Sequence, residues 1–311
     1  MNILPFQQIS KKDVHLVGGK GANLGEMTSA GVQVPDGFVV SSVVFENFLE
    51  NTGIENKINE IIGKIDLKNS ESIKISSDEI KKLIQESETT KEVEKNIFDS
   101  FEKLDCEYVA VRSSATVEDS ATDSWAGQLD TFSDVTKEDL IKNIKNCWAS
   151  LFSERALFYR IEKKMTEQKI SVAVVVQKMV ESQVSGVCFT VHPVSKDENQ
   201  LIIEAGFGLG EAIVSGLITP DSYIVNKKDL KILDKNISNQ DEMIVRSKNG
   251  KGTDIISVKS TSSQKLSDDD IIKLSELCIK IEKHYKSPQD IEWAFKDSEF
   301  YILQSRPITT L

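Results

Sequence analysis

The segment Tyr108-Val-Ala-Val-Arg-Ser-Ser-Ala-Thr116 joins a short apolar run directly to an arginine and a polar stretch. Its first four residues have the composition of a buried strand. Arg112 follows at once, and a polar loop then runs on to 127–131, which can add backbone donors and a hydroxyl. A guanidinium directly after so apolar a strand is costly to bury unless an anion pairs with it. We therefore expect Arg112 to meet either a bound phosphate or a carboxylate at Glu118 or Asp119.

On both sides of this segment the patterns predict helices mixed with strands. Residues 54–104 are rich in Lys, Glu and Ile at helical spacing, and we expect packing helices with little chemistry there. Thr136 and Asp139 resemble a capping box for a helix that continues to about residue 152. Further strands are expected at 170–176, 186–191, 201–204, 222–225, around an Asn249-Gly250 turn, and at 290–295 and 300–304, with a helix at 267–282. This mixture predicts an α+β fold.

The length of the chain predicts two lobes. At about 150 residues per unit, 311 residues suit two cores. We find no internal repeat and no low-complexity linker, so we expect the lobes to pack across a cleft rather than to be tethered. We place the boundary between 1–180 and 181–311.

The composition argues against two classes of partner. No apolar run approaches the roughly 18 residues of a membrane span, and the first five residues are too short for a signal peptide. We therefore expect a cytoplasmic protein with no membrane partner. The chain has 49 acidic and 38 basic residues, a net charge of −11. This charge argues against nucleic acid, whose phosphates are bound mainly by clustered Lys and Arg.

The turn Gly18-Gly-Lys-Gly21 is the glycine-rich segment best suited to a phosphate. It opens a helical stretch from Ala22, so backbone N–H groups and the Lys20 ammonium can meet phosphate oxygens together. A plain turn is the alternative interpretation. No GxxxxGK[ST] motif is present, and Gly206-Phe-Gly-Leu-Gly-Glu211 ends in glutamate where a dinucleotide fingerprint needs its third glycine.

The last two expected strands bring oxygen donors and an arginine together. Asp290 and Glu292 share one face of their strand because successive side chains alternate, and Gln304 and Arg306 share a face of the partner strand. Such a set suits a Mg²⁺ that bridges phosphates, with the arginine offsetting charge in the transition state. A solvated sheet face with cross-strand pairs is the alternative.

Together these motifs resemble the ATP-binding domain of phosphoenolpyruvate synthase, pyruvate phosphate dikinase and rifamycin phosphotransferase. The motifs that carry the resemblance are Val17-Gly-Gly-Lys-Gly-Ala-Asn-Leu-Gly25, Val111-Arg-Ser-Ser-Ala-Thr116, Ala126-Gly-Gln128, Asp130-Thr131, Ser185-Gly-Val-Cys-Phe-Thr190, Gly206-Phe-Gly-Leu-Gly-Glu211, Asp290-Ile-Glu-Trp293 and Leu303-Gln-Ser-Arg-Pro307. They cover nearly the whole chain in order. The resemblance implies an ATP-grasp fold of two lobes with ATP in the cleft between them.

The resemblance also implies a role for individual residues. It implies that Gln177 lies at the adenine edge and that Glu292 and Gln304 are ligands of Mg²⁺, which together with ATP is the expected cofactor. Arg306 is implied to act on the transferred phosphate, and Arg112 is a second catalytic candidate. The residues that the resemblance places around the ATP phosphates from the first lobe are Lys20, Arg112, Gly127 and Thr131.

In this family the β-phosphoryl of ATP passes to a histidine on a separate swivelling domain. No Thr-Ser-His-type phosphoacceptor segment occurs in this sequence, which ends at Leu311. We therefore expect the ATP half-reaction of a pyruvate, water dikinase, with a phosphohistidine domain in trans and pyruvate as an indirect acceptor. The alternatives are part of a rifamycin-type antibiotic phosphotransferase and a nucleotide-binding regulatory subunit without turnover.

Overall fold

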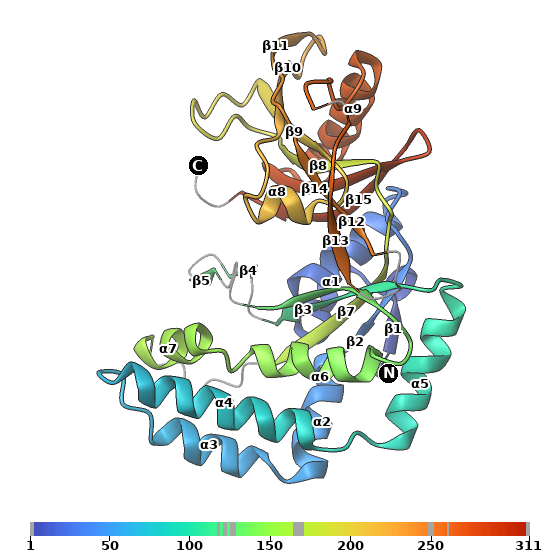
Figure 1. Ribbon diagram of the computed structural model, residues 1–311. Helices are drawn as coiled ribbons and strands as arrows, with labels where there is room; N and C mark the ends of the chain where they lie inside the picture. Colours follow the sequence, from blue (N-terminus) through green and yellow to red (C-terminus); the bar gives the residue numbers. More distant parts are fainter. Residues whose placement is uncertain are drawn as a thin grey trace. The chain divides into compact units, whose positions relative to one another are not determined.

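The computed structural model describes residues 3–116, 119–120, 123–124, 129–163, 171–247, 252–259 and 261–308. The chain forms two compact units, which are Met1–Glu26 with Asp36–Met179 and Met27–Pro35 with Val180–Leu311 (Figure 1). Each unit has its own antiparallel sheet and its own helices. The predicted α+β class is therefore confirmed.

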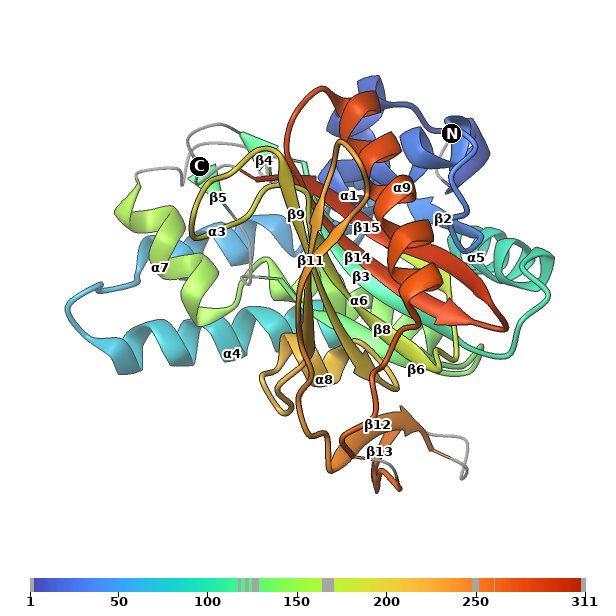
Figure 2. The ribbon, with the colours of Figure 1, turned by 90° about the horizontal axis from the view of Figure 1, so that it is seen from above.

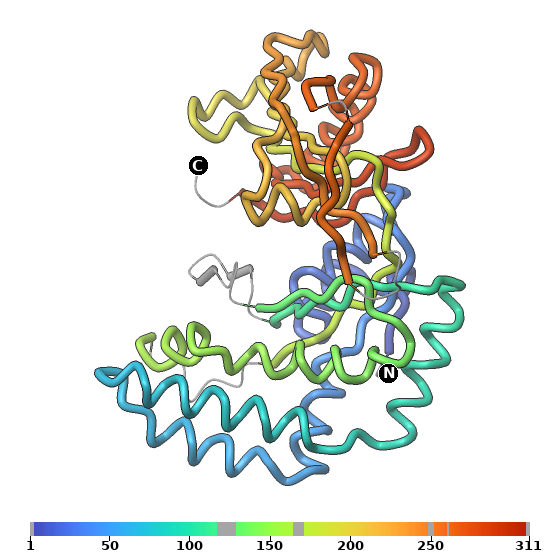
Figure 3. Tube along the Cα trace, viewed as in Figure 1, coloured from blue at the N-terminus to red at the C-terminus, as the bar shows by residue number. Residues whose placement is uncertain are grey.

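A five-stranded sheet forms the centre of the first unit. Its strands lie in the order β1 (Ile3–Pro5), β2 (Gly37–Val40), β7 (Val172–Lys178), β3 (Val109–Ala115) and β6 (Thr131–Val135), and all neighbours are antiparallel. Its helices are α1 (Val14–Ser29), α2 (Ser42–Thr52), α3 (Glu55–Gly63), α4 (Ser70–Glu86), α5 (Lys91–Lys103), α6 (Leu140–Ser150) and α7 (Glu154–Glu162). Short 3-10 turns at Phe6–Gln8 and Lys11–Asp13 precede α1, and the pair β4 (Asp119–Ser120) and β5 (Asp123–Ser124) lies outside this sheet. The predicted helices across 54–104 are confirmed, and Figure 3 shows α3 and α4 running side by side.

The central strand β7 is apolar because both of its faces are buried. Val172, Val174 and Val176 belong to the core under the helices, and Val175 on the other face is also fully buried. Strands covered on both faces have continuous apolar runs rather than alternating ones. On the helical side the ring of Trp148 lies 4.9 to 5.6 Å from two phenylalanine rings of α2. Each such buried side chain contributes about 1.5 to 3 kcal/mol to stability.

Two local predictions for this unit were wrong. Arg112 lies inside β3 rather than after it, because the polar residues that follow it remain in the ladder and their hydroxyls find partners. The capping box does not form: α6 begins at Leu140, its N-cap Asp139 makes no side-chain bond, and Thr136 lies before an intervening turn. The Thr136 hydroxyl is therefore too far back in the chain to cap the helix.

A six-stranded sheet forms the centre of the second unit. Its strands lie in the order β11 (Ile232–Asn236), β10 (Asp221–Asn226), β9 (Gln200–Phe207), β8 (Val184–Phe189), β14 (Gln289–Lys296) and β15 (Glu299–Pro307). The long helix α9 (Asp268–Tyr285) packs against this sheet (Figure 2), and the short helix α8 (Glu211–Val214) follows β9. The helix predicted at 267–282 is confirmed, and Ser267 Oγ caps it by accepting the Asp270 N–H. The strands β12 (Glu242–Arg246) and β13 (Thr253–Ser257) pair as expected, and their Asn249-Gly250 turn lies outside the described residues.

Gly186 allows a close approach inside this sheet. A Cβ atom at this position would lie 1.8 Å from the carbonyl oxygen of Glu204 and 2.7 Å from the ring of Trp293. Trp293 on β14 is fully buried. Glycine is therefore the residue that lets this large ring cross β8.

No helix in the described part of the chain is both long enough and apolar enough to cross a membrane.

Candidate active site

One face of the first sheet collects several of the predicted nucleotide residues. Thr131 lies directly opposite Arg112 in the pairing of β6 with β3. Gln177 lies opposite Ala110, which is two residues before Arg112 on the same strand. Directly opposed residues and residues two apart share a face. Arg112, Thr131 and Gln177 therefore lie on one face, and this face is opposite to the one that carries the helix-covered core residue Val111.

The turn that carries Lys20 meets the same face at a kink in α1. Gly18 has φ 69° and ψ 175°, which interrupts the helix, and a new helical segment begins after it. The Ser114 hydroxyl donates to the Val17 carbonyl at 2.9 Å and accepts the Gly21 N–H at 3.3 Å. A Cβ atom at Gly18 would lie 2.2 Å from this hydroxyl, so only glycine fits. Because Ser114 and Arg112 share a face of β3, this contact brings the turn that carries Lys20 to the Arg112 face.

The chemistry of the first-unit face suits a polyphosphate. Lys20 and Arg112 are half-buried, Thr131 is exposed, and Gln177 is buried at 3% exposure. A helix that starts beside the ammonium adds backbone donors and a favourable dipole for negative charge. Gly127, the fourth predicted phosphate neighbour, lies outside the described residues.

The second sheet pairs the predicted magnesium and arginine residues across two adjacent strands. The register of β14 and β15 sets Asp290 opposite Arg306 and Glu292 opposite Gln304. The shared faces predicted from alternation are therefore confirmed. Gln304 is 6% exposed, whereas the Arg306 side chain is 47% exposed. One face of this sheet thus presents a carboxylate, an amide and a guanidinium together.

Asp290 holds Arg306 in place. The arginine Nε donates to Asp290 Oδ2 at 2.9 Å, and its Nη2 forms an ion pair with the same oxygen at 2.7 Å. Burial raises the pKa of Asp290 above its ordinary value, the pair with Arg306 acts in the opposite direction, and the charge of Glu292 raises it further. Sequence reasoning treated Asp290 only as an oxygen donor beside Glu292. The structure instead commits its carboxylate to orienting the arginine.

Glu204 is a further acidic residue on this face that sequence reasoning missed. It lies opposite Val187, which lies opposite Glu292, so one row crosses β9, β8, β14 and β15. Burial raises the pKa of Glu204, and the nearby charge of Asp290 raises it further. An acid at the end of the apolar run Leu201-Ile-Ile-Glu204 was the available signal in the sequence.

The residues present on this face fit a magnesium ion that is bound together with a nucleotide. Within the described ranges there is no group of three or more His, Cys, Asp or Glu residues that could hold a metal by itself. Mg²⁺ commonly takes one or two protein oxygens and completes its shell with phosphates and water. Glu292 and Gln304 supply two such oxygens from directly opposed positions.

Comparison with known proteins agrees with these motifs. Residues 14–311 match the family described as pyruvate phosphate dikinase, AMP/ATP-binding domain. Probable phosphoenolpyruvate synthases from Archaeoglobus fulgidus and Methanocaldococcus jannaschii are 46% and 44% identical, over 100% and 98% of this chain. A rifampicin phosphotransferase from Bacillus cereus is 39% identical over 99% of it. The chain spans 42%, 26% and 36% of the lengths of these relatives, in that order.

The family match covers most of both units, from the first residue of α1 to residue 311. It includes the Arg112 face of the first sheet and the Glu292 face of the second. Family membership carries with it the ATP-grasp class expected from the motifs. The chain belongs to the family of pyruvate phosphate dikinase AMP/ATP-binding domains.

Proposed function

We propose that this chain binds Mg·ATP and passes the β-phosphoryl group to a phosphohistidine domain, as the nucleotide-using part of a phosphoenolpyruvate synthase-type phosphotransferase. The observation that carries the proposal is the register of β14 and β15, which opposes Glu292 to Gln304 and Asp290 to Arg306. Two oxygen donors for a metal ion and an oriented guanidinium are among the recurring parts of sites that transfer phosphoryl groups from magnesium nucleotides. The family match and the similarity to phosphoenolpyruvate synthases support it.

In this proposal the first-unit face binds the nucleotide in its ground state. Lys20 and the helix start beside it meet phosphate oxygens that are charged before any reaction. Arg112 and Thr131 add a guanidinium and a hydroxyl, and Gly127 adds a backbone donor. Gln177 contributes to recognition of the adenine edge.

The second-unit face supplies the transfer step. Glu292 and Gln304 would hold Mg²⁺, which when bound neutralises charge on the phosphate oxygens. Arg306 meets the charge that develops on the transferred phosphoryl group, and Asp290 keeps its guanidinium oriented. Arg112 is the second guanidinium available to the phosphates. Water is the co-reactant: the β-phosphoryl group passes to the histidine, the γ-phosphoryl group is released to water as phosphate, and AMP is the nucleotide product.

Pyruvate is the final acceptor in this proposal. The two phosphoenolpyruvate synthases above are 44% and 46% identical to the chain, compared with 39% for the rifampicin phosphotransferase. A regulatory subunit without turnover has less need of an oriented arginine beside magnesium ligands, so the Asp290–Arg306 pair favours an enzyme.

Three alanine variants test this division of roles. Arg306→Ala should leave ATP affinity nearly unchanged and slow transfer to a supplied phosphohistidine domain by roughly 10³-fold or more. Lys20→Ala should weaken ATP binding. Glu292→Ala should lower both affinity and rate, and added magnesium should recover part of the affinity. Calorimetry measures the affinity, and AMP formation measures the rate.

The Arg306 variant also decides whether this arginine acts in the transfer step or only binds phosphate. If Arg306→Ala weakened ATP binding as much as Lys20→Ala and left transfer in the bound complex unchanged, the arginine would only clamp a phosphate. A wild-type chain that bound no ATP in the presence of magnesium would overturn the proposal as a whole.

A further inference from the structure

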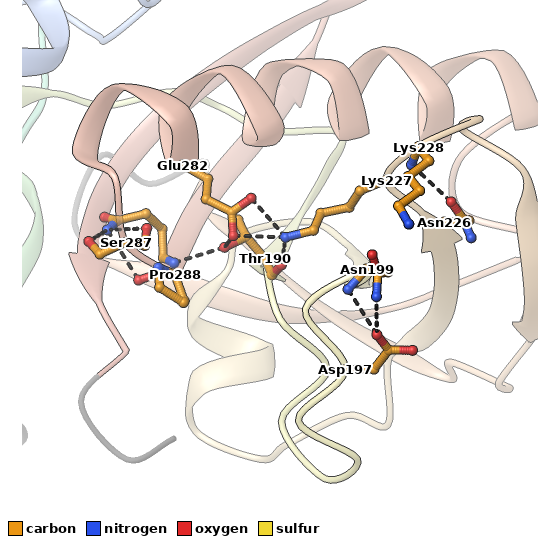
Figure 4. Close-up of polar contacts among 10 residues, drawn as sticks. Thr190, Asp197, Asn199, Asn226, Lys227, Lys228, Glu282, Ser287 and Pro288 are labelled. Carbon is orange, nitrogen blue, oxygen red and sulfur yellow. Dashed lines mark hydrogen bonds and ion pairs between the residues drawn. The ribbon is translucent and has the colours of Figure 1, made fainter.

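The opposite face of the second sheet carries a buried chain of polar contacts, shown in Figure 4. It begins at Lys227, which follows β10. Its Nζ lies 2.8 Å from each carboxylate oxygen of Glu282 in α9 and donates to the Thr190 carbonyl at 2.7 Å. The two charged side chains are only 13% and 18% exposed. The ion pair is thus largely withdrawn from solvent and tied to the backbone at the end of β8.

Thr190 links the Lys227–Glu282 ion pair to β14 by hydrogen bonds. Its hydroxyl donates to Glu282 Oε1 at 2.8 Å and accepts the Gln289 N–H at 2.8 Å. Its own N–H donates to the Gln289 carbonyl at 2.9 Å. Thr190 and Gln289 are both fully buried. The first residue of β14 is therefore fixed on both its N–H and its C=O by one threonine.

Gln289 continues the chain of contacts to β15. Its Oε1 accepts the Ser305 hydroxyl at 2.8 Å, and its Nε2 donates to the Ser287 carbonyl and hydroxyl at 3.1 and 2.9 Å. Gln289 immediately precedes Asp290 in sequence, and Ser305 lies between Gln304 and Arg306. The network therefore fixes the backbone of both strands directly behind the candidate magnesium and arginine residues.

Stability alone does not account for such a network. Withdrawing a lysine and a glutamate from water costs energy that their attraction often only balances, and well-packed apolar residues are frequently at least as stabilising. Burial of an apolar face already opposes a slip of one residue, because that slip would move every side chain of a strand to the other face. A slip of two residues, however, keeps each side chain on its face and would still move Glu292 away from Gln304. Directional bonds from Thr190 to β14 and from Gln289 to β15 prevent that slip.

We infer that Thr190 is a positioning residue for the candidate active site. Its hydrogen bonds connect the Lys227–Glu282 ion pair to β14, and Gln289 extends the connection to β15. The two strands are thereby held so that Glu292 lies opposite Gln304 and Arg306 remains paired with Asp290. This inference rests on the proposed function. Thr190 does not contact the nucleotide, because its side chain lies on the α9 side of the sheet, where it bonds to Glu282.

Thr190→Val and Thr190→Ser test the inference. Valine keeps the shape but leaves the Gln289 N–H and a Glu282 oxygen without the hydroxyl, whereas serine keeps it. At a temperature well below unfolding, Thr190→Val should raise the Mg²⁺ concentration for half-maximal ATP binding by about tenfold and slow transfer similarly. Thr190→Ser should stay close to wild type. Ser305→Ala, a milder change farther along the network, should shift both quantities in the same direction.

Tyr223→Phe is the matched control. It removes a buried hydroxyl of the same sheet, which donates to Asp221 Oδ2 at 2.6 Å and accepts the Lys265 and Leu266 N–H groups at 3.3 and 3.4 Å. None of these bonds belongs to the network. Tyr223→Phe should lower the melting temperature and leave the Mg²⁺ dependence unchanged. Wild-type Mg²⁺ dependence in both Thr190→Val and Ser305→Ala would overturn the inference. Failure of the proposed function would show instead in the wild-type protein, as absence of magnesium-dependent ATP binding.

Discussion

Replacing Ser114 by alanine is expected to weaken ATP binding by loosening the turn that carries Lys20. The Ser114 side chain is fully buried. Its hydroxyl makes two bonds to α1, at 2.9 Å to the Val17 carbonyl and at 3.3 Å from the Gly21 N–H. These bonds flank Gly18, where the helix restarts. Alanine would keep β3 intact and remove both bonds at once.

The expected magnitude follows from these two bonds. Loss of a side-chain acceptor at the start of a helix costs about 1 kcal/mol. A carbonyl left buried without its donor costs about 1 kcal/mol or more. Ser114→Ala should therefore lower the free energy of unfolding by about 2 kcal/mol, out of a typical total of 5 to 15 kcal/mol. A hydrogen bond from the Lys20 ammonium to a phosphate contributes about 1.5 to 3 kcal/mol, so a loosened turn should lower ATP affinity by about tenfold.

Ser77→Ala is the control for this experiment. Ser77 is also fully buried in the first unit, and its hydroxyl donates to the Phe152 carbonyl at 2.8 Å within the helical layer. Urea unfolding should show a loss of stability for both variants, and calorimetry should show a loss of ATP affinity for Ser114→Ala alone. If Ser114→Ala lost the expected stability but bound ATP like wild type, Ser114 would not position Lys20.

Two other predictions concern Glu204 and Gln177. Because burial and then Asp290 raise the folded-state pKa of Glu204, its ionised form costs stability at neutral pH, and this cost disappears below the ordinary pKa of the unfolded chain. Glu204→Gln should therefore raise the melting temperature at pH 7 and raise it much less near pH 4, and an equal rise at both pH values would contradict this reasoning. If Gln177 lies at the adenine edge, ATP should bind more tightly than GTP, and Gln177→Ala should reduce that preference by roughly 10-fold because it removes a base-specific hydrogen bond. Competition binding measures the preference. If the wild type bound ATP and GTP with equal affinity, the assignment of Gln177 to the adenine edge would be wrong.

Much of the second-unit face could be predicted because its determinants are local in sequence. Asp290 and Glu292 are two residues apart, and a short turn leads to Gln304 and Arg306, so strand alternation fixes which side chains share a face. The turn uses left-handed backbone at Asp297 and Ser298. Alternation does not show how charges pair across strands. Cross-strand pairs were the alternative interpretation of this face, and the structure shows that Asp290 and Arg306 form one.

The remaining features depend on contacts between distant parts of the chain. Ser114 and Val17 are 97 residues apart. The sequence Arg112-Ser-Ser-Ala resembles a loop until the partners of its hydroxyls are known. The same holds for Thr190 and Glu282, which are 92 residues apart. A serine or threonine has the same local signal whether its hydroxyl faces solvent or joins two elements, so pattern reasoning assigned no role to either.

Ser114 and Thr190 have the same role in their two units, because each hydroxyl holds the backbone near a charged candidate site residue. A face that binds phosphates must carry charged side chains that stay partly exposed, such as Lys20 and Arg306, and such side chains cannot be fixed by close apolar packing. Their backbone must then be held by other means. Hydrogen bonds supply the needed direction, because they weaken steeply as the angle departs from linear, and burial strengthens them. Each hydroxyl joins the strand bearing a site residue to a second element. We therefore expect that removing either hydroxyl will lower ATP affinity and the transfer rate more than an equally destabilising substitution within the apolar cores.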